Sequence, residues 1–304
     1  MISTTFNIGW MGTGIMGKHM AGHLIKHGHK ISVFNRTKSK TDDLVAKGAT
    51  YATPEEIAKN CNVIFMMLGY PQDVKDIVYG DKGILNLVQP GSIIIDHTTS
   101  SPQLAEQLYE DFKKKEVSFL DIPVSGGDVI AEKGEVNALA GGDKEIFEKI
   151  VPLLKCYSKQ TNHFGPAGKG LQAKLYSQIC LAINLAGVIE ALMFGMKTGL
   201  DPEQLFNVLK ESGASSYAMN IYMPRILKGD LEPSITVELF VKDLEMILEE
   251  SKRFHIVLPI ITQLRQFYEA LMANGGAKKG FQALILTLAK LNGIEKDIKD
   301  NKPL

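Results

Sequence analysis

The sequence has little cysteine, no excess of charge of either sign and no N-terminal export signal. Its three cysteines, Cys61, Cys156 and Cys180, are odd in number and far apart, which argues against a disulfide framework and against a zinc or other metal site. We expect reduced, buried thiols. The 34 basic residues equal the 34 acidic residues in number, so no footprint for nucleic acid or an anionic membrane is visible. Because residues 1–10 lack a basic region and a long apolar region, a cytoplasmic location is expected.

The length and the apolar content favour a globular protein with two domains. A chain of 304 residues is long enough for two cores of ordinary size. A hydrophobic fraction of 45% with 22% charged residues is that of a soluble globular protein. We predict an α/β fold in which a Rossmann-type, doubly wound sheet domain (1–165) is followed by an all-α domain (166–304), the two being joined by a long interdomain helix.

A glycine motif near the N-terminus predicts a dinucleotide-binding turn. The apolar run 5–11 leads into Gly12-Thr13-Gly14-Ile15-Met16-Gly17, and a helical pattern continues to Ile25. In such a strand, turn and helix, Gly12 allows the tight turn, Gly14 lets the backbone approach a pyrophosphate, and Gly17 packs the helix on the strand. Ile15 and Met16 would line the phosphates at the helix N-terminus. The alternative interpretation is a glycine-rich turn without a ligand.

The residues after the second strand indicate which dinucleotide binds. That strand, 30–34, is followed by Asn35, Arg36 and Thr37, where an NAD-type site would place an acidic residue for the ribose hydroxyls. Arg36 is instead suited to bind a 2′-phosphate, so the sequence predicts NADP, with NADPH preferred over NADH. The alternative is a solvated basic turn.

Further apolar runs and helical patterns predict repeated βα units on a parallel sheet. The runs 62–68 and 92–96 are almost continuously apolar, as strands covered on both faces are, with helices beginning near Pro71 and Ile84 between them. Ligands bind at the carboxyl ends of such strands. The cofactor candidates there are Met67, Leu68, Thr98 and Thr99.

A serine and two glycines follow the next predicted strand, 117–124. Ser125, Gly126 and Gly127 present consecutive backbone N–H groups to an anion, and a small carboxylate is the natural guest. The alternative is an ordinary turn. Two more strands, 136–141 and 161–164, with a helix at 144–154, would complete the sheet domain.

The stretch 165–199 predicts a long helix at the start of the all-α half. Because 171–196 is apolar around nearly its whole circumference, we expect this helix to be buried on all sides. Lys174 is costly to bury there without a function, although a lysine can also reach a wet edge. A membrane span is the alternative, but Asn184 and Glu190 interrupt the run. Further helices are predicted at 202–211, 217–227, 237–254, 259–272 and 281–291. The helix at 237–254 carries Lys242 among apolar residues.

Taken together, these segments resemble the β-hydroxyacid dehydrogenases, the group of 3-hydroxyisobutyrate dehydrogenase, tartronate semialdehyde reductase and the glyoxylate/succinic semialdehyde reductases. The resemblance spans nearly the whole chain. It rests on IGWMGTGIMGKHM (8–20), FNRT (34–37), DHTTSSP (96–102), DIPVSGG (121–127), GKGLQAKLYSQ (168–178) and KDL (242–244).

The resemblance implies a role for each of these positions. Ser125, Gly126 and Gly127 would hold the substrate carboxylate, Lys174 would donate and accept the proton, Gln178 would bind near the reacting oxygen, and Lys242 would lie at the cofactor or substrate. Three positions depart from the family pattern, since Ser177 stands in place of an amide, His97 in place of the more usual methionine and Thr98 in place of the more usual serine. The resemblance also implies a homodimer or homotetramer formed through the helical domain.

The expected reaction is reversible hydride transfer between a nicotinamide and a small carboxylate-bearing aldehyde or β-hydroxy acid. A lysine with an ordinary pKa of about 10.4 is a ready acid and a poor base at neutral pH, which favours reduction of a semialdehyde such as glyoxylate, succinic or tartronate semialdehyde. One alternative is an oxidative 3-hydroxyisobutyrate dehydrogenase. A more remote alternative is a non-catalytic nucleotide-binding module.

Overall fold

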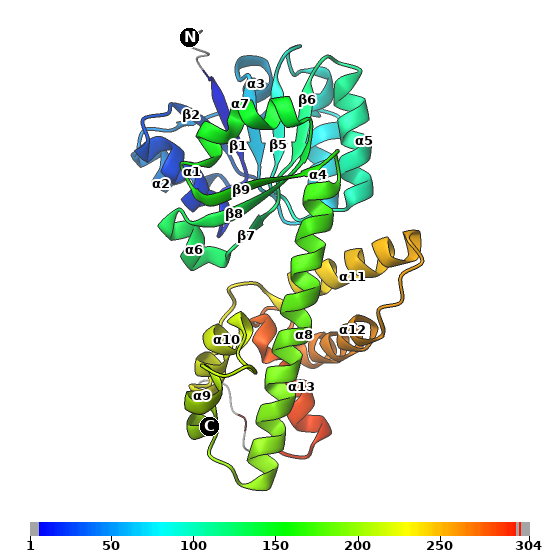
Figure 1. The fold of residues 1–304 in the computed structure, drawn as a ribbon. Coiled ribbons are helices and arrows are strands. Elements are labelled where there is room, and N and C mark those ends of the chain that lie inside the picture. The colour runs from blue at the N-terminus through cyan, green and yellow to red at the C-terminus, as the bar shows by residue number, and fades with distance from the viewer. Residues whose placement is uncertain (1–5, 296–297, 299–304) are drawn as a thin grey trace. The chain divides into compact units, whose positions relative to one another are not determined.

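The computed structural model describes residues 6–295 and 298, and the chain divides into two compact units. The first, here called the sheet unit, is Met1–Lys174, and the second, the helical unit, is Leu175–Leu304. The boundary falls inside the long helix α8 (Lys169–Thr198), which is drawn in light green in Figure 1. The prediction of a Rossmann-type sheet followed by an all-helical half is confirmed.

The sheet unit is built on one sheet of nine strands with the order β3-β2-β1-β4-β5-β6-β8-β7, and β9 pairs with β8. The strands are β1 (Ile8–Met11), β2 (Ile31–Phe34), β3 (Thr50–Tyr51), β4 (Val63–Met66), β5 (Ile93–Asp96), β6 (Ser118–Asp121), β7 (Val124–Ser125), β8 (Val136–Gly142) and β9 (Ser158–Gly165). Neighbours from β3 to β6 are all parallel. The order reverses at β1 and β4, the switch point at which doubly wound sheets bind ligands.

Helices cover both faces of this sheet because most positions of its central parallel strands are apolar and buried on both sides. Along β1, Trp10 belongs to the buried cluster on one face and Met11 to the cluster on the other, as the two-residue period of a strand requires. The first face carries α1 (Gly17–Lys26), α2 (Asp42–Ala46), α6 (Gly127–Lys133) and α7 (Lys144–Leu154), and the second carries α3 (Pro54–Asn60), α4 (Pro71–Tyr79) and α5 (Pro102–Lys113) (Figure 1).

The far edge of the sheet differs from the prediction. We expected only parallel strands, but β8 pairs antiparallel with both β6 and β7, and the predicted strand 117–124 is interrupted between β6 and β7. The predicted helix at Ile84 is only a 3₁₀ turn, Ile84–Asn86. Among the strands and α-helices of the sheet unit, β3, α2, α3 and α6 were not predicted, because runs of two to seven residues give little periodic signal. Thr5, the first residue of the predicted β1 strand, lies outside the described residues.

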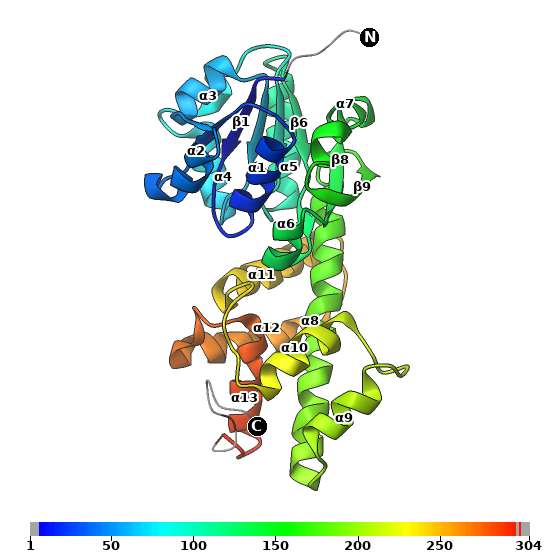
Figure 2. The same cartoon turned by 90° about the vertical axis from the view of Figure 1, so that its left-hand side faces the viewer.

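In the helical unit the later turns of α8 pack with five further helices (Figure 2). These are α9 (Pro202–Leu209), α10 (Tyr217–Leu227), α11 (Val237–Arg253), α12 (Pro259–Leu271) and α13 (Leu284–Leu291). Aromatic rings fill the centre of the core, where Phe240 lies 5.2 Å from Tyr268 and 4.7 Å from Phe281 between ring centroids. Asp201 caps α9, since its side chain accepts the Gln204 N–H.

The prediction that α8 is buried on all sides is wrong. Tyr176 and Phe194 are 70% and 68% exposed, and Cys180 is exposed as well, so the expectation of three buried thiols fails too. By length and composition α8 is the one helix among the described residues that could span a membrane, and 44% of its most apolar segment is buried within the structure. A core helix of a soluble protein meets the same criterion, and α8 contributes Leu185 and Ile189 to the core of the helical unit.

Candidate active site

The glycine motif forms the tight turn between β1 and α1. Gly12 has a φ of 99°, and a Cβ there would collide with the backbone carbonyl of Met67. A Cβ at Gly17 would collide with the carbonyl oxygen of Gly12, so this glycine packs the start of α1 against the turn. In contrast, no described atom lies within 4 Å of a Cβ built on Gly14. Two glycines therefore close the turn, and the third leaves its backbone open.

The first turn of α1 suits a phosphate. Among the described residues, no side chain caps this helix and no acidic residue lies in its first turn. The positive end of the helix dipole therefore lies beside the open backbone of Gly14 without a competing carboxylate. Ile15, in the same turn, is 52% exposed, and Met16 is partly buried. Backbone and dipole together fit the pyrophosphate of a dinucleotide.

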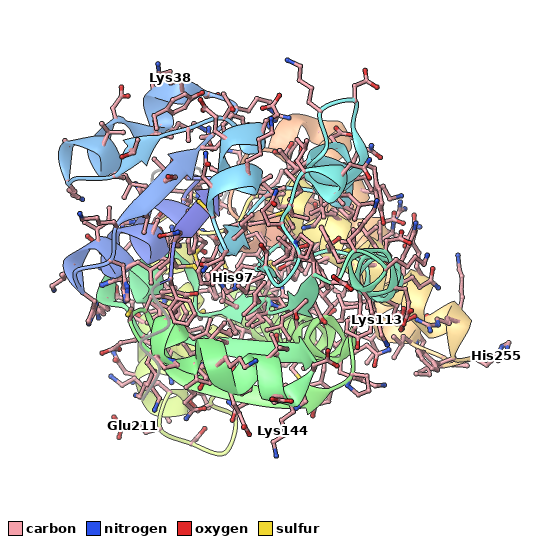
Figure 3. All side chains as sticks on the ribbon, turned by 90° about the horizontal axis from the view of Figure 1, so that it is seen from above. Lys38, His97, Lys113, Lys144, Glu211 and His255 are labelled. Atoms are coloured by element: carbon pink, nitrogen blue, oxygen red, sulfur yellow. The ribbon has the colours of Figure 1, made fainter. Side chains whose placement is uncertain are left out.

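A buried aromatic cluster packs against the glycine turn between β1 and α1. Trp10 donates its Nε1–H to the carbonyl oxygen of Gly12 at 2.9 Å and stacks on Phe65, with ring centroids 5.2 Å apart. His97 and Tyr157 complete the cluster, and Figure 3 shows His97 in the interior of the sheet unit. Since this tryptophan is the chain's only one, its fluorescence reports directly on the turn.

His97 has a structural role in this cluster. Its Nδ1 contacts the carbonyl oxygen of Ile122, which can only accept, so Nδ1 carries the hydrogen and Nε2 accepts the Tyr157 hydroxyl hydrogen at 2.8 Å. Complete burial lowers the pKa of His97 to about 4. The imidazole is therefore uncharged near neutral pH.

The loop after β2 forms the part of the site that would hold the adenosine. Asn35 accepts the Thr13 N–H at 3.1 Å through Oδ1 and donates to the carbonyl oxygen of Thr37 at 3.0 Å through Nδ2. Its amide thus ties this loop to the glycine turn. Arg36 extends into solvent, 87% exposed, and forms an ion pair with Asp73 at 3.0 Å. Lys38, at the periphery in Figure 3, lies over the Tyr51 ring at 4.6 Å.

The ends of β4 and β5 are joined through Thr98. This threonine has no exposed surface, and its hydroxyl oxygen accepts the Leu68 N–H at 2.9 Å. Its own N–H donates to Asp96 Oδ1 at 2.9 Å. Thr98 therefore fixes the backbone of Leu68, whereas Thr99 and Met67 keep some exposed surface.

Ser125, Gly126 and Gly127 form the turn between β7 and α6. The φ angles of Gly126 and Gly127 are 147° and 69°, which other residues rarely adopt. A Cβ at Gly126 would lie 2.8 Å from the Ile130 side chain. Ser125 pairs with Asn137 of β8 and is partly buried. Asp128 lies in the first turn of α6 and offsets part of the positive field of this turn.

Lys174 lies in the second turn of α8, partly buried, in the last position of the sheet unit. Asp121, at the end of β6, is buried and accepts hydrogen bonds from the first turn of the same helix. Lys174, Ser177 and Gln178 share one helix face because they are three and four residues apart.

In the helical unit the buried carboxylate of Asp243 contacts two of the predicted site residues, Gln178 and Lys242. Gln178 donates its Nε2–H to Asp243 Oδ2 at 2.7 Å, and Lys242 Nζ lies 3.3 Å from Asp243 Oδ1. Asp243 is 2% exposed and Gln178 is 4% exposed. The carboxylate therefore fixes the amide of Gln178, and its charge offsets that of Lys242.

Four carboxylates of these clusters were not predicted as site residues: Asp73, Asp96, Asp121 and Asp243. Two of them carry a signal in the sequence. Asp96 and Asp121 each end an apolar strand, and a carboxylate so placed is buried and needs hydrogen-bond donors. The donors lie in other segments, which no local pattern identifies.

Comparisons with known proteins identify the family of this chain. Residues 7–165 match the model described as the NAD binding domain of 6-phosphogluconate dehydrogenase, and residues 168–288 match the model described as NAD-binding of NADP-dependent 3-hydroxyisobutyrate dehydrogenase. The probable 3-hydroxyisobutyrate dehydrogenase-like 1 of Arabidopsis thaliana is 39% identical over 97% of this chain and 88% of its own length.

Two further relatives cover almost the whole chain. The 2-hydroxy-3-oxopropionate reductase of Escherichia coli is 30% identical over 92% of this chain and 96% of its own length. The solved structure of Psf3 in complex with NADP⁺ and 2-OPP is 26% identical, with a TM-score of 0.84 over 92% of this chain and 99% of that one.

The fold and these matches define an NAD(P)-binding oxidoreductase of two parts, a doubly wound sheet followed by helices. More particularly, the chain belongs to the β-hydroxyacid dehydrogenase family, as its motifs predicted. It is an NAD(P)-dependent enzyme that acts on CH–OH groups of hydroxy acids, so the alternative of a non-catalytic module is set aside.

Proposed function

We propose that this enzyme is an NADP(H)-dependent reductase of small carboxylate-bearing aldehydes. The observation that carries the proposal is the loop after β2. There Asn35 uses its amide to hold Thr13 and Thr37, and the next side chain, Arg36, is exposed and basic. A 2′-phosphate at this loop would bind the guanidinium of Arg36. Asn35, the residue directly after β2, is an uncharged amide and would not repel the phosphate.

The open backbone at Gly14 and the uncapped start of α1 fit the pyrophosphate of this cofactor. We assign Ile15, Met16 and Thr37 to the same phosphate and ribose region, and Met67, Leu68 and Thr99 to the nicotinamide end. When bound, the nicotinamide supplies the hydride. Thr98 acts indirectly, since its hydroxyl holds the Leu68 N–H.

The chain supplies the proton and the substrate contacts. We assign to Lys174 the role of general acid, whose Nζ gives a proton to the oxygen of the aldehyde as hydride reaches the carbonyl carbon. The aldehyde is reduced to the hydroxy acid, the cofactor is oxidised, and the lysine is reprotonated from solvent. The N–H groups of Gly126 and Gly127, with the Ser125 hydroxyl, bind the carboxylate. Gln178 and Lys242, both held by Asp243, contact the substrate or cofactor.

A second candidate is the oxidative direction on 3-hydroxyisobutyrate. It is favoured by the relatives named for that reaction. Reduction is the stronger proposal, because the exposed and basic Arg36 favours NADPH, the form of the cofactor that supplies hydride. Rates in both directions with the same acid and aldehyde separate the two candidates.

We also propose that residues 1–165 bind the cofactor, that residues 166–304 serve the substrate and oligomer contacts, and that the enzyme is a cytoplasmic homodimer or homotetramer. The exposed face of α8 supports the oligomer. Tyr176, Cys180, Asn184, Gly187, Ala191 and Phe194 are exposed at intervals of three and four residues and form a stripe along one helix face, which is apolar except at Asn184. An exposed apolar stripe of this kind typically marks a protein interface. Light scattering of the purified protein gives the oligomeric state.

One screen tests the proposed reaction. Oxidation of NADPH and of NADH is followed at 340 nm with glyoxylate, succinic semialdehyde, tartronate semialdehyde and methylmalonate semialdehyde. We expect turnover with at least one acid, faster with NADPH. An unbranched aldehyde without a carboxylate is the control and should react poorly. Equal rates with and without the carboxylate would contradict the assignment of Ser125, Gly126 and Gly127.

A further inference from the structure

We propose that Asp121 is a positioning residue that fixes the first turn of α8 and thereby the place of Lys174. The inference rests on the proposed function, because it concerns the lysine to which we assign the proton. Asp121 is the last residue of β6 and has no exposed surface. Its two carboxylate oxygens accept one hydrogen bond each, Oδ1 from Gly168 N–H and Oδ2 from Leu171 N–H, both at 2.8 Å.

These two donors belong to the start of α8, which begins at Lys169. The first N–H groups of a helix have no partner within the helix. Here they are satisfied by a carboxylate from a strand 47 and 50 residues away, not by a neighbouring serine or threonine. The negative charge also lies at the positive end of the helix dipole. The strand, and not the local sequence, therefore sets the orientation of this turn.

Two glycines bring the helix close enough for this contact. A Cβ at Gly170 would collide with the backbone carbonyls of Leu139 and Asp121. A Cβ at Gly141 of β8 would lie 2.5 Å from Asp121 Oδ1 and 2.7 Å from the Gly170 nitrogen. The first turn of α8 therefore rests directly on the backbone of β6 and β8. A side chain at either position would push the turn away.

The hydrogen bond between Leu171 and Asp121 also constrains Lys174. Leu171, whose N–H is held, precedes Lys174 by three residues, so the two lie on adjacent turns of one helix face. A shift or rotation of the first turn moves the Nζ of Lys174 with it, and errors of about 1 Å in a catalytic group can lower turnover about 10²-fold.

The surroundings of Asp121 make its two hydrogen bonds to the start of α8 sensitive to the charge of its carboxylate. Burial raises the pKa of Asp121 to about 7, and the neighbouring carboxylate Asp96, its register partner on β5, acts in the same direction. The two backbone donors, Gly168 and Leu171, oppose this shift because they favour the ionised form. An amide at this position keeps one acceptor and turns an N–H toward the second donor.

The test uses Asp121→Asn in the full-length enzyme. We expect kcat to fall about 10- to 100-fold, while the dissociation constant for NADPH, read from Trp10 fluorescence, stays within about twofold. Thr53→Ala is the control for the loss of a helix cap elsewhere, since Thr53 caps α3 and has no place in the site. Its kcat should match the wild type.

Amide hydrogen exchange reports on the contact between Asp121 and the start of α8 without any measurement of catalysis, and in the wild type it needs no variant. In the wild type the amides of Gly168 and Leu171 should be strongly protected, and in Asp121→Asn this protection should fall in residues 168–174. Unprotected amides in the wild type would overturn the proposal even if no variant folds. So would a wild-type kcat in a variant that has lost protection. If the wild type reduces none of the acids but the amides are protected, the proposed reaction fails and the helix cap stands.

Discussion

Arg36 and Asp73 form an ion pair of 3.0 Å between the loop after β2 and the first turn of α4. Asp73 is fixed in place, because its other oxygen accepts the Tyr70 N–H at 3.1 Å. The guanidinium that we assign to the 2′-phosphate therefore has a carboxylate beside it. A phosphate must share Arg36 with Asp73 or displace it, so Asp73 moderates the preference for NADPH.

Changes at this pair should move the cofactor preference in opposite directions. Arg36→Ala is expected to lower the ratio of kcat/KM for NADPH over NADH by about 10- to 100-fold, because a charge-assisted hydrogen bond is worth ~1.5–3 kcal/mol. Asp73→Asn should raise the ratio, since Arg36 is then free of a competing anion. Steady-state kinetics with both cofactors measure the ratio.

The matched control is Lys75→Ala, which removes an exposed charge from the same helix α4. Its ratio should equal that of the wild type. A wild type that uses NADH as well as NADPH would refute the assignment of Arg36. Asn35→Asp is a poorer test, because a carboxylate there would face the carbonyl oxygen of Thr37 in place of the present Nδ2–H.

Lys174→Ala should lower kcat by roughly 10² to 10⁴, the usual contribution of a positioned general acid, with cofactor affinity little changed. Lys197→Ala, at the exposed end of the same helix, serves as the control and should keep its activity. Single-turnover kinetics with NADPH measure the chemical step directly. Retained turnover in Lys174→Ala would remove this lysine from the mechanism.

Gly126→Ala should raise KM for the acid substrate by at least tenfold. The φ of 147° is strained for any side chain, and the new Cβ would press on Ile130. The N–H groups of the turn would then no longer converge on the carboxylate. Ser125→Ala deletes only one donor and should raise KM less. The NADPH dissociation constant should be unchanged in both variants, and a KM equal to that of the wild type in Gly126→Ala would contradict the anion site.

His97 should make the protein less stable in acid. Because burial lowers its folded-state pKa from 6.5 to about 4, the unfolded chain binds a proton that the folded chain does not. Its stabilising contribution is present above pH 6.5 and is lost as the pH falls toward 4, by roughly 3 kcal/mol in total at ~1.4 kcal/mol per pH unit.

Asp121 acts in the opposite sense, since its raised pKa contributes stability at low pH that is lost as the pH rises toward 7. The contribution of His97 is therefore separated from that of Asp121 by comparing the wild type with His97→Met. Urea unfolding of both proteins between pH 4 and pH 7.5 gives their difference in unfolding free energy. We expect the difference to shrink as the pH falls, and a constant difference would show that His97 does not titrate in this range.

Sequence patterns predicted the cofactor half of the fold well, because its signals are local. Strands such as β1 and β4 are short apolar runs between a turn and a helix, and the glycine motif specifies its own turn. The strand β8 was predicted as 136–141, but its antiparallel direction was missed, since the direction of a strand near the edge of a sheet depends on the path of the chain. The exposure of Tyr176 was missed as well, because an apolar helix face looks the same in sequence whether it meets a core or the surface.

The sequence by itself determined the class of fold, the family and the residues that a dinucleotide turn requires, because spacing along the chain fixes strand, turn and helix. Tertiary structure alone decided which carboxylate meets which partner. Asp121 reaches Leu171 of α8 across 50 residues, Arg36 reaches Asp73 across 37, and Gln178 reaches Asp243 across 65. Such contacts form only when the topology brings distant segments together, and burial then makes each charge depend on the donors that the fold places beside it.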